Sequence, residues 1–185
     1  MKIINFLKAR FRKFLNEEIW LEDYIAMGMK VGEKCSIQTG LVVDYQNCWL
    51  IEIGYDVTIA PYVYLLAHDA STNKHLKYTK LGRIVLEDHC FIGARSIIMP
   101  GVIVGKNAIV AAGSVVVKNV EPNTVVGGNP AKYICSLEEF ITKQNLTMES
   151  APIYDQSFTL RKNISDEKKR KMNEELKYKF GYRHL

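Results

Sequence analysis

The sequence predicts a mainly β protein, in which short strands stack in successive coils as a parallel β-helix. The first indication is an apolar residue at every sixth position of residues 86–121, namely Leu86, Ile92, Ile98, Val104, Val110 and Val116. Six is a multiple of the two-residue strand period but not of the 3.6-residue helix period, so only strands keep these side chains on one face. A short fixed repeat is typical of a solenoid whose coils bury their apolar residues against one another.

A second indication is the fifth position of each hexad, which holds only small or β-branched residues. These are Cys90, Ser96, Val102, Ala108, Ser114 and Val120. A small residue fits a tight corner between two strands, so the stretch is interpreted as short strands joined by corners.

The chain before the coil, residues 1–28, is predicted to be helical. Residues 2–16 place apolar side chains on one side and basic side chains elsewhere, as in an amphipathic helix. Such a helix packs on the protein body or contacts an anionic membrane surface, and both alternatives stay open. Residues 17–29 are expected to form a second short helix that ends near Gly28 and covers the end of the coil.

The coil is expected to occupy residues 29–135, with two interruptions. Residues 44–50 break the repeat once, and residues 67–83 form a longer polar excursion before Leu86 restores the register. Loops that leave a rigid solenoid commonly carry binding and catalytic groups, so the longer excursion is a candidate site.

Residues 136–185 are predicted to form a helical C-terminal tail. Ser136–Glu139 fits the S-x-x-E capping box, which opens a helix that runs to about Asn145. Residues 146–163 show no steady period and are expected to form an irregular arm. Ser165 then precedes a charged helix that is expected to end near Gly181.

Composition and charge limit the classes of function. The formal net charge is +5, and Lys and Arg are spread over both ends and one loop, so a nucleic-acid partner has little support. No apolar run is long enough to span a bilayer and no signal-peptide cleavage pattern is present, so a cytoplasmic location is expected. Cys35, Cys48, Cys90 and Cys135 form no C-x-x-C pair and are interpreted as buried thiols.

Four segments carry a family resemblance: Phe91–Ala94, Met99–Val102, Ala111–Val116 and Gly128–Lys132. They resemble the hexapeptide-repeat acyltransferases, in the branch of galactoside, maltose and streptogramin acetyltransferases and capsular-polysaccharide O-acetyltransferases. The resemblance implies a left-handed β-helix, a handedness that the repeat alone does not supply, because parallel crossovers are otherwise right-handed. It also implies acetyl-coenzyme A as cosubstrate, no metal, and a homotrimer with the site between subunits.

The resemblance identifies His68 as the general base. In the family, a histidine in the loop after an A-P-x-V-x-(I/L) strand removes the proton of the acceptor hydroxyl, and Ile59–Tyr64 precedes His68 in this way. A neutral imidazole suits this task near pH 7. The remaining histidines, which do not match the motif, are His75, His89 and His184.

The same resemblance implies a coenzyme A site. Ala94 and Ala112 would offer backbone groups to the pantetheine arm, while Val117, Lys118 and Lys132 would lie near the adenine and the phosphates. Val117 stands where many relatives have threonine, so only its backbone would contribute. Lys132 stands where arginine is common, and it keeps the charge without the bidentate geometry.

The acceptor side is assigned from residues beside the two interruptions. Asp44 and Trp49 flank the first, where an aromatic platform would suit a sugar ring; the alternative is a turn residue and a core cap. Asp69, which directly follows His68, is also assigned to the acceptor side. Its carboxylate is expected to orient the imidazole.

Together these features predict an acetyl-coenzyme-A-dependent O-acetyltransferase that acts directly on a sugar hydroxyl in surface-polysaccharide synthesis. The enzyme alternatives are acetylation of an antibiotic or N-acetylation of an amino sugar. Two alternatives come from other classes. One is a zinc-dependent β-helix carbonic anhydrase, which needs three zinc-binding histidines, and the other is a non-catalytic scaffold at a membrane surface.

Overall fold

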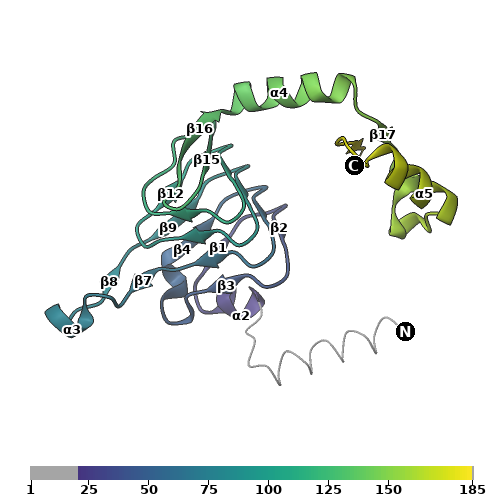
Figure 1. Ribbon diagram of the computed structural model, residues 1–185. Coiled ribbons are helices and arrows are strands. Elements are labelled where there is room, and N and C mark those ends of the chain that lie inside the picture. The colour runs from purple at the N-terminus through teal and green to yellow at the C-terminus, as the bar shows by residue number, and fades with distance from the viewer. Residues whose placement is uncertain (1–20, 185) are drawn as a thin grey trace, which may run out of the picture. The chain divides into compact units, whose positions relative to one another are not determined.

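The computed structural model describes residues 21–184, which divide after Leu137 into a coil unit and a C-terminal unit (Figure 1). The coil unit is a left-handed parallel β-helix, so the predicted fold class is confirmed. The amphipathic helix predicted for residues 2–16 lies outside the described residues. The short helix α2 (Leu21–Ala26) falls within the predicted second helix, and Gly28 follows it with a φ of +107°.

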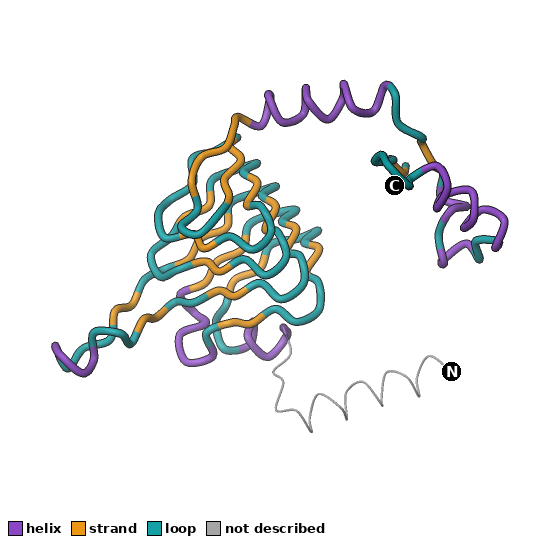
Figure 2. The backbone as a smooth tube through the Cα atoms, viewed as in Figure 1, coloured by secondary structure: helices purple, strands orange, loops and turns teal. Residues whose placement is uncertain are grey.

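Three sheets form the sides of the coil, and the chain visits them in the same order in each turn (Figure 2). Sheet A contains β1 (Lys30–Val31), β4 (Ile51–Ile53), β9 (Ile84–Leu86) and β12 (Ile103–Val104). Sheet B contains β2 (Ser36–Ile37), β5 (Thr58–Ile59), β10 (Phe91–Ile92), β13 (Ile109–Val110), β15 (Thr124–Gly127) and the antiparallel β16 (Lys132–Ser136). Sheet C contains β3 (Val42–Val43), β6 (Tyr64–Leu65), β11 (Ile97–Ile98) and β14 (Val115–Val116).

The register of the sheets places the apolar residue of each hexad above that of the previous coil. In sheet B, for example, Ile59 pairs with Ile92, and Ile92 pairs with Val110. All six apolar residues that predicted the fold are buried, and so are the six small residues at the fifth position. The Ser114 hydroxyl, at one of these corners, donates to the Ala111 carbonyl oxygen at 2.5 Å, so its burial leaves no unpaired polar group.

The corners share one backbone conformation. Three residues after an inward-facing position, the chain adopts a positive φ at Lys34, Gly40, Asp56, Tyr62, His89, Arg95, Gly101, Asn107, Gly113 and Asn123. This left-handed conformation costs glycine little and suits asparagine better than most residues. Gly93 serves a different purpose, because a Cβ there would lie 2.4 Å from the Ala112 backbone nitrogen of the next coil.

Both interruptions leave the coil between sheet C and sheet A. The first contains the 3₁₀ helix η1 (Tyr45–Leu50), and the second contains the antiparallel strands β7 (His68–Asp69) and β8 (Lys80–Leu81) with the short helix α3 (Asn73–Leu76) between them. The excursion predicted for residues 67–83 is therefore a hairpin that projects from the coil (Figure 1).

The C-terminal unit begins with the predicted helix, but this helix ends at Glu149 rather than near Asn145, so it includes the start of the segment predicted to be irregular. The segments of this unit are α4 (Leu137–Glu149), β17 (Ile153–Tyr154), η2 (Gln156–Phe158), η3 (Leu160–Lys162), α5 (Asp166–Glu175) and β18 (Tyr182–Arg183). Ser165 caps α5 as predicted, its hydroxyl accepting from the Lys168 backbone N–H. However, α5 ends at Glu175 rather than near Gly181, because the chain then turns back so that β18 pairs with β17.

The four cysteines are free thiols, but only two of them match the prediction of burial. Cys48 and Cys90 are buried, whereas Cys35 and Cys135 are partly exposed at the surface of the coil unit. Burial raises the pKa of the Cys90 thiol to about 12, so this thiol stays protonated at neutral pH. Within residues 21–184, no helix has the length and apolar character needed to cross a membrane.

Candidate functional site

The clearest chemical arrangement in the coil unit is a histidine–aspartate pair at the corner between sheets C and A. His68 Nδ1 lies 2.6 Å from Asp44 Oδ2. Asp44 directly follows β3 and His68 begins the excursion after β6, and these two strands pair in sheet C. Two interruptions that leave neighbouring coils at one corner therefore bring these residues together.

Asp44 is held in place by contacts besides the imidazole. Its side chain is only 2% exposed, and its carboxylate accepts from Asn47 Nδ2 at 3.2 and 3.4 Å. Its backbone N–H donates to the Leu65 carbonyl oxygen at 3.0 Å. A buried carboxylate with fixed partners can define the orientation of an imidazole that donates to it.

The pair leaves one imidazole nitrogen available for proton transfer. An ionised carboxylate only accepts hydrogen bonds, so we assign the proton to Nδ1 of His68, and Nε2 then carries a free lone pair. The His68 side chain is 39% exposed, so a molecule from solvent can reach it. This arrangement can remove a proton from a bound hydroxyl group.

Asp69, the residue predicted to orient the imidazole, has a different partner. Its Oδ1 accepts from the Ser71 backbone N–H at 2.8 Å, and this hydrogen bond lowers the pKa of Asp69. The carboxylate beside His68 is that of Asp44, which the sequence had placed on the acceptor side. The repeat contained the necessary signal, because Val43 and Leu65 occupy equivalent positions just before the two interruptions.

Trp49 lies on η1 and is 56% exposed, so it is not a cap buried in the core. Tyr45 at the start of η1 is similarly exposed. The first interruption therefore presents aromatic surface on the short segment that directly follows Asp44.

A second histidine–aspartate pair lies at another corner of the coil, between sheets A and B. His89 Nδ1 is 3.0 Å from Asp56 Oδ2, and the Tyr55 ring packs edge-on against the imidazole. The Asp56 side chain is 53% exposed, whereas that of Asp44 is buried. This exposed pair provides a control of similar chemistry for the His68 site.

The residues predicted to bind coenzyme A lie along both edges of sheet C. Ala94 and Ala112 occupy the corner between sheets B and C on adjacent coils, where the Gly113 backbone N–H donates to the Ala94 carbonyl oxygen at 2.8 Å. Lys118 lies at the opposite corner, which is also the corner of His68, and lines a pocket of about 200 Å³ with Ala131 and Tyr133.

The remaining two predicted cofactor residues are exposed. Val117 precedes Lys118 directly, and Lys132 begins β16 directly after Ala131. Two cations are thus placed next to residues of one small pocket at the end of the coil. Across the described range 21–184, no group of three or more His, Cys, Asp or Glu side chains is arranged to hold a metal ion.

Comparison with known proteins agrees with this architecture. The family model "Hexapeptide repeat of succinyl-transferase" matches residues 83–118. The putative acetyltransferase YvoF of Bacillus subtilis (strain 168) is 32% identical over 131 residues, which cover 71% of this chain and 73% of YvoF. Protein CapG of Staphylococcus aureus is 34% identical over 145 residues, which cover 74% of this chain and 83% of CapG.

Among solved structures, the crystal structure of the polySia-specific acetyltransferase NeuO is similar to the coil. The sequence identity is 30% and the TM-score is 0.51, and the match covers 57% of this chain and 50% of NeuO. The match therefore covers only part of each of the two chains.

The orienting role of Asp44 leads to a prediction about the His68 tautomer. In Asp44→Asn, the amide can donate to Nδ1, so the proton of His68 is expected to move to Nε2. Nitrogen-15 NMR of the imidazole distinguishes the two tautomers. Asp56→Asn is the matched control and should leave the His68 signals unchanged, whereas an unchanged tautomer in Asp44→Asn would contradict the orienting role.

Proposed function

Since this chain belongs to the hexapeptide-repeat acetyltransferases, we propose that it transfers the acetyl group of acetyl-coenzyme A to a saccharide hydroxyl, with His68 as general base. The observation that carries the proposal is the 2.6 Å contact between His68 and the buried carboxylate of Asp44. A carboxylate in this position keeps the imidazole in one tautomer and directs its free nitrogen to solvent.

The pair supports direct transfer without an acyl-enzyme. His68 Nε2 accepts the proton of the acceptor hydroxyl while the hydroxyl oxygen attacks the thioester carbonyl carbon. The new C–O bond forms, the C–S bond breaks, and His68 returns the proton to the leaving thiolate. Asp44 accepts from Nδ1–H throughout and stabilises the imidazolium that exists between the two proton transfers.

The cosubstrate assignment is supported by the end of the coil. Lys118 is a cation that lines a small pocket together with Ala131. Lys132, which directly follows Ala131, is a second cation. Ammonium groups suit phosphate groups as point charges. Ala94 and Ala112 add no bulk at the other edge of sheet C, so a narrow pantetheine chain could pass close to the backbone there.

The saccharide assignment is supported by two observations. NeuO is specific for polySia, a sugar polymer, and the exposed rings of Trp49 and Tyr45 lie on the segment that follows Asp44. Aromatic faces stack well on sugar rings, so we place acceptor binding here and the reaction in surface-polysaccharide synthesis. A screen of sugars, nucleotide sugars and antibiotics for acetyl-coenzyme A consumption tests this assignment, and turnover of antibiotics alone would contradict it.

The active unit is proposed to be a homotrimer with the site between subunits. Val42, Tyr64, Ile97 and Val115 form an outward-facing apolar row in sheet C, in which each residue pairs with the next. A continuous apolar row on a surface marks an association site. The row lies between the two corners that carry the predicted cofactor residues, so a second copy packed there would complete the site.

Replacement of His68 tests the mechanism. His68→Ala should lower acetyl transfer by about 10²–10⁴-fold, because the general base is lost, while coenzyme A affinity stays the same. His89→Ala removes the other aspartate-paired histidine and should keep transfer within a few-fold of the parent. Equal losses in the two variants, measured by thiol release, would rule out a specific role for His68.

Replacement of Lys118 tests the cofactor site. Lys118→Ala should raise the Kd of coenzyme A by about tenfold, because a charge-assisted contact to phosphate is lost. Lys106→Ala, at a corner between sheets A and B, is the control with the same change of charge. Calorimetric titration measures both, and an unchanged Kd in Lys118→Ala would remove this residue from the site.

A charge in the apolar row tests the assembly. Ile97→Glu should convert a trimer into monomers, because burying an unpaired carboxylate at an apolar interface is costly. Thr58→Glu introduces the same charge on the outward side of sheet B and should leave the trimer intact. Light scattering coupled to size-exclusion chromatography gives the mass, and a monomeric parent protein would refute the proposal outright.

A further inference from the structure

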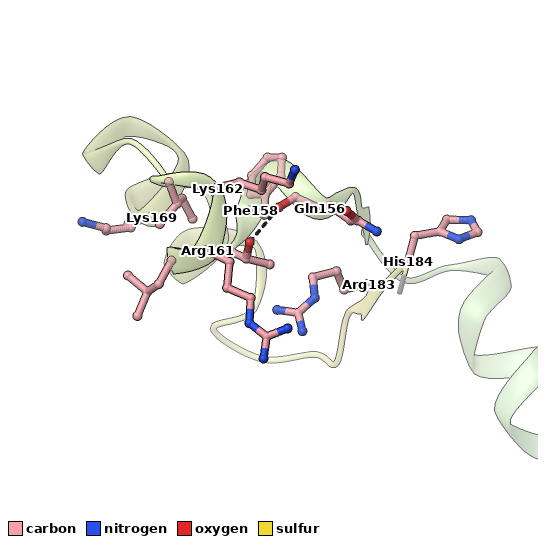
Figure 3. Close-up of a pocket in the computed structure, with 10 residues that line it drawn as sticks. Gln156, Phe158, Arg161, Lys162, Lys169, Arg183 and His184 are labelled. Atoms are coloured by element: carbon pink, nitrogen blue, oxygen red, sulfur yellow. Dashed lines mark hydrogen bonds between the residues drawn. The ribbon is translucent and has the colours of Figure 1, made fainter. Parts of the chain in front are cut away.

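The C-terminal unit contains a pocket that plays no part in the proposed transfer reaction. Its volume is about 860 Å³, and all its lining residues lie between Gln156 and His184 (Figure 3). This volume is within the range of small-molecule sites in proteins, which is about 300–1,000 Å³. The pocket belongs to the C-terminal unit alone, so its chemistry is independent of the coil.

The walls of the pocket are connected by backbone hydrogen bonds. β17 and β18 pair in parallel, with Tyr154 opposite Arg183, and the His184 N–H donates to the Tyr154 carbonyl oxygen at 3.0 Å. After β17, the Asp155 carboxylate accepts from the Ser157 backbone N–H at 2.7 Å and starts η2. These bonds hold the segment that carries Arg183 beside the segment that leads to Arg161.

The charge lining the pocket is entirely positive. It includes Arg161, Lys162, Lys169 and Arg183, and no Asp or Glu lines it. Lys169 is neutralised by Asp166 at 2.7 Å. The other three cations have no carboxylate partner within 4.0 Å among the described residues.

The two arginines differ from the lysines in direction. In Figure 3, Arg161 and Arg183 extend toward the same part of the pocket, while Lys162 and Lys169 point away from it. Guanidinium groups present paired N–H donors that match the two oxygens of a carboxylate or phosphate. Both groups line this pocket and neither has a carboxylate partner among the described residues, so a bound oxyanion would supply the counter-ion that they lack there.

The lining also includes an apolar wall formed by Phe158, Leu160 and Ile164, beside the polar residues Gln156, Thr159 and His184. Phe158 is held by Tyr154, with the ring centroids 5.0 Å apart, and by Lys168, whose ammonium lies 4.8 Å from the Phe158 ring centroid. Leu160 and Ile164 add aliphatic surface. A pocket with an apolar wall and two arginines therefore suits an organic molecule that carries an anionic group, rather than an inorganic ion alone.

The geometry points to a second ligand site in the C-terminal unit, which binds an organic oxyanion of nucleotide or trisaccharide size. Arg161 and Arg183 bind its phosphate or carboxylate oxygens, and Phe158 contacts its ring. The site is proposed to bind this molecule and not to react with it. It does not depend on the acetyl-transfer proposal.

Calorimetric titration of the full chain with two probes tests the site. Uridine diphosphate supplies phosphate oxygens and trigalacturonate supplies carboxylates, while maltotriose is the neutral control. At least one anionic probe should bind saturably and maltotriose should not. The tighter of the two anions identifies which oxyanion the site takes. Failure of both anions to bind would overturn the proposal.

The double substitution R161Q/R183Q locates the binding. It should weaken the anionic probe by at least about tenfold, because charge-assisted hydrogen bonds are lost. The matched control K177Q/K179Q removes the same charge from the same unit outside the pocket and should change the Kd less than threefold. Both variants keep Lys118 and Lys132, so an anion bound at the proposed cofactor site contributes equally to each.

A third variant separates paired hydrogen bonding from charge alone. R161K/R183K keeps the net charge and the fold-supporting side-chain length, and it should still weaken binding several-fold, because ammonium groups lack the paired donors. Equal weakening in R161Q/R183Q and K177Q/K179Q would show diffuse attraction to a basic surface, and would refute the site. Far-ultraviolet circular dichroism checks that each variant is folded.

Discussion

The stacking of inward-facing apolar residues from coil to coil is the constraint on which the rest of this structure depends. Each coil is a loop of short strands with no stability of its own, and it becomes stable only when its interior side chains are covered above and below. Full burial of an Ile, Leu or Val side chain contributes about 1.5–3 kcal/mol, and each coil contributes several of them. The same stacking fixes the register, because a slip of one residue would turn every apolar side chain outward.

This constraint explains where chemistry is possible. The coil tolerates extra residues only at its corners, since an insertion within a strand would destroy the register. Two insertions at the same corner of neighbouring coils are therefore brought together by the stacking of Val43 on Leu65. Asp44 directly follows Val43 and His68 comes three residues after Leu65, so the register places the starts of the two interruptions beside each other.

The two units provide different kinds of binding surface. In the coil unit, the residues proposed for acetyl transfer lie at corners on the two sides of sheet C, and the outward face of that sheet carries a row of apolar side chains. In the C-terminal unit, by contrast, a pocket is formed within a single segment of chain, by strands and 3₁₀ turns that connect to one another. Two guanidinium groups line this pocket, and neither has a carboxylate partner within the described residues, which is the basis for proposing an anionic ligand there.

The sequence by itself determined the coil, its corners, its interruptions and the cap of α5, because each follows from a local period or from neighbouring residues. It also placed His68 at the base of the excursion. Only the tertiary structure decided that Asp44, and not the adjacent Asp69, orients the imidazole, since Asp69 bonds to the backbone two residues ahead while Asp44 arrives from the neighbouring coil. The basic pocket could not be predicted from the sequence, because Arg161 and Arg183 line one pocket in a unit where β17 pairs with β18, and no periodicity in the sequence indicates that pairing.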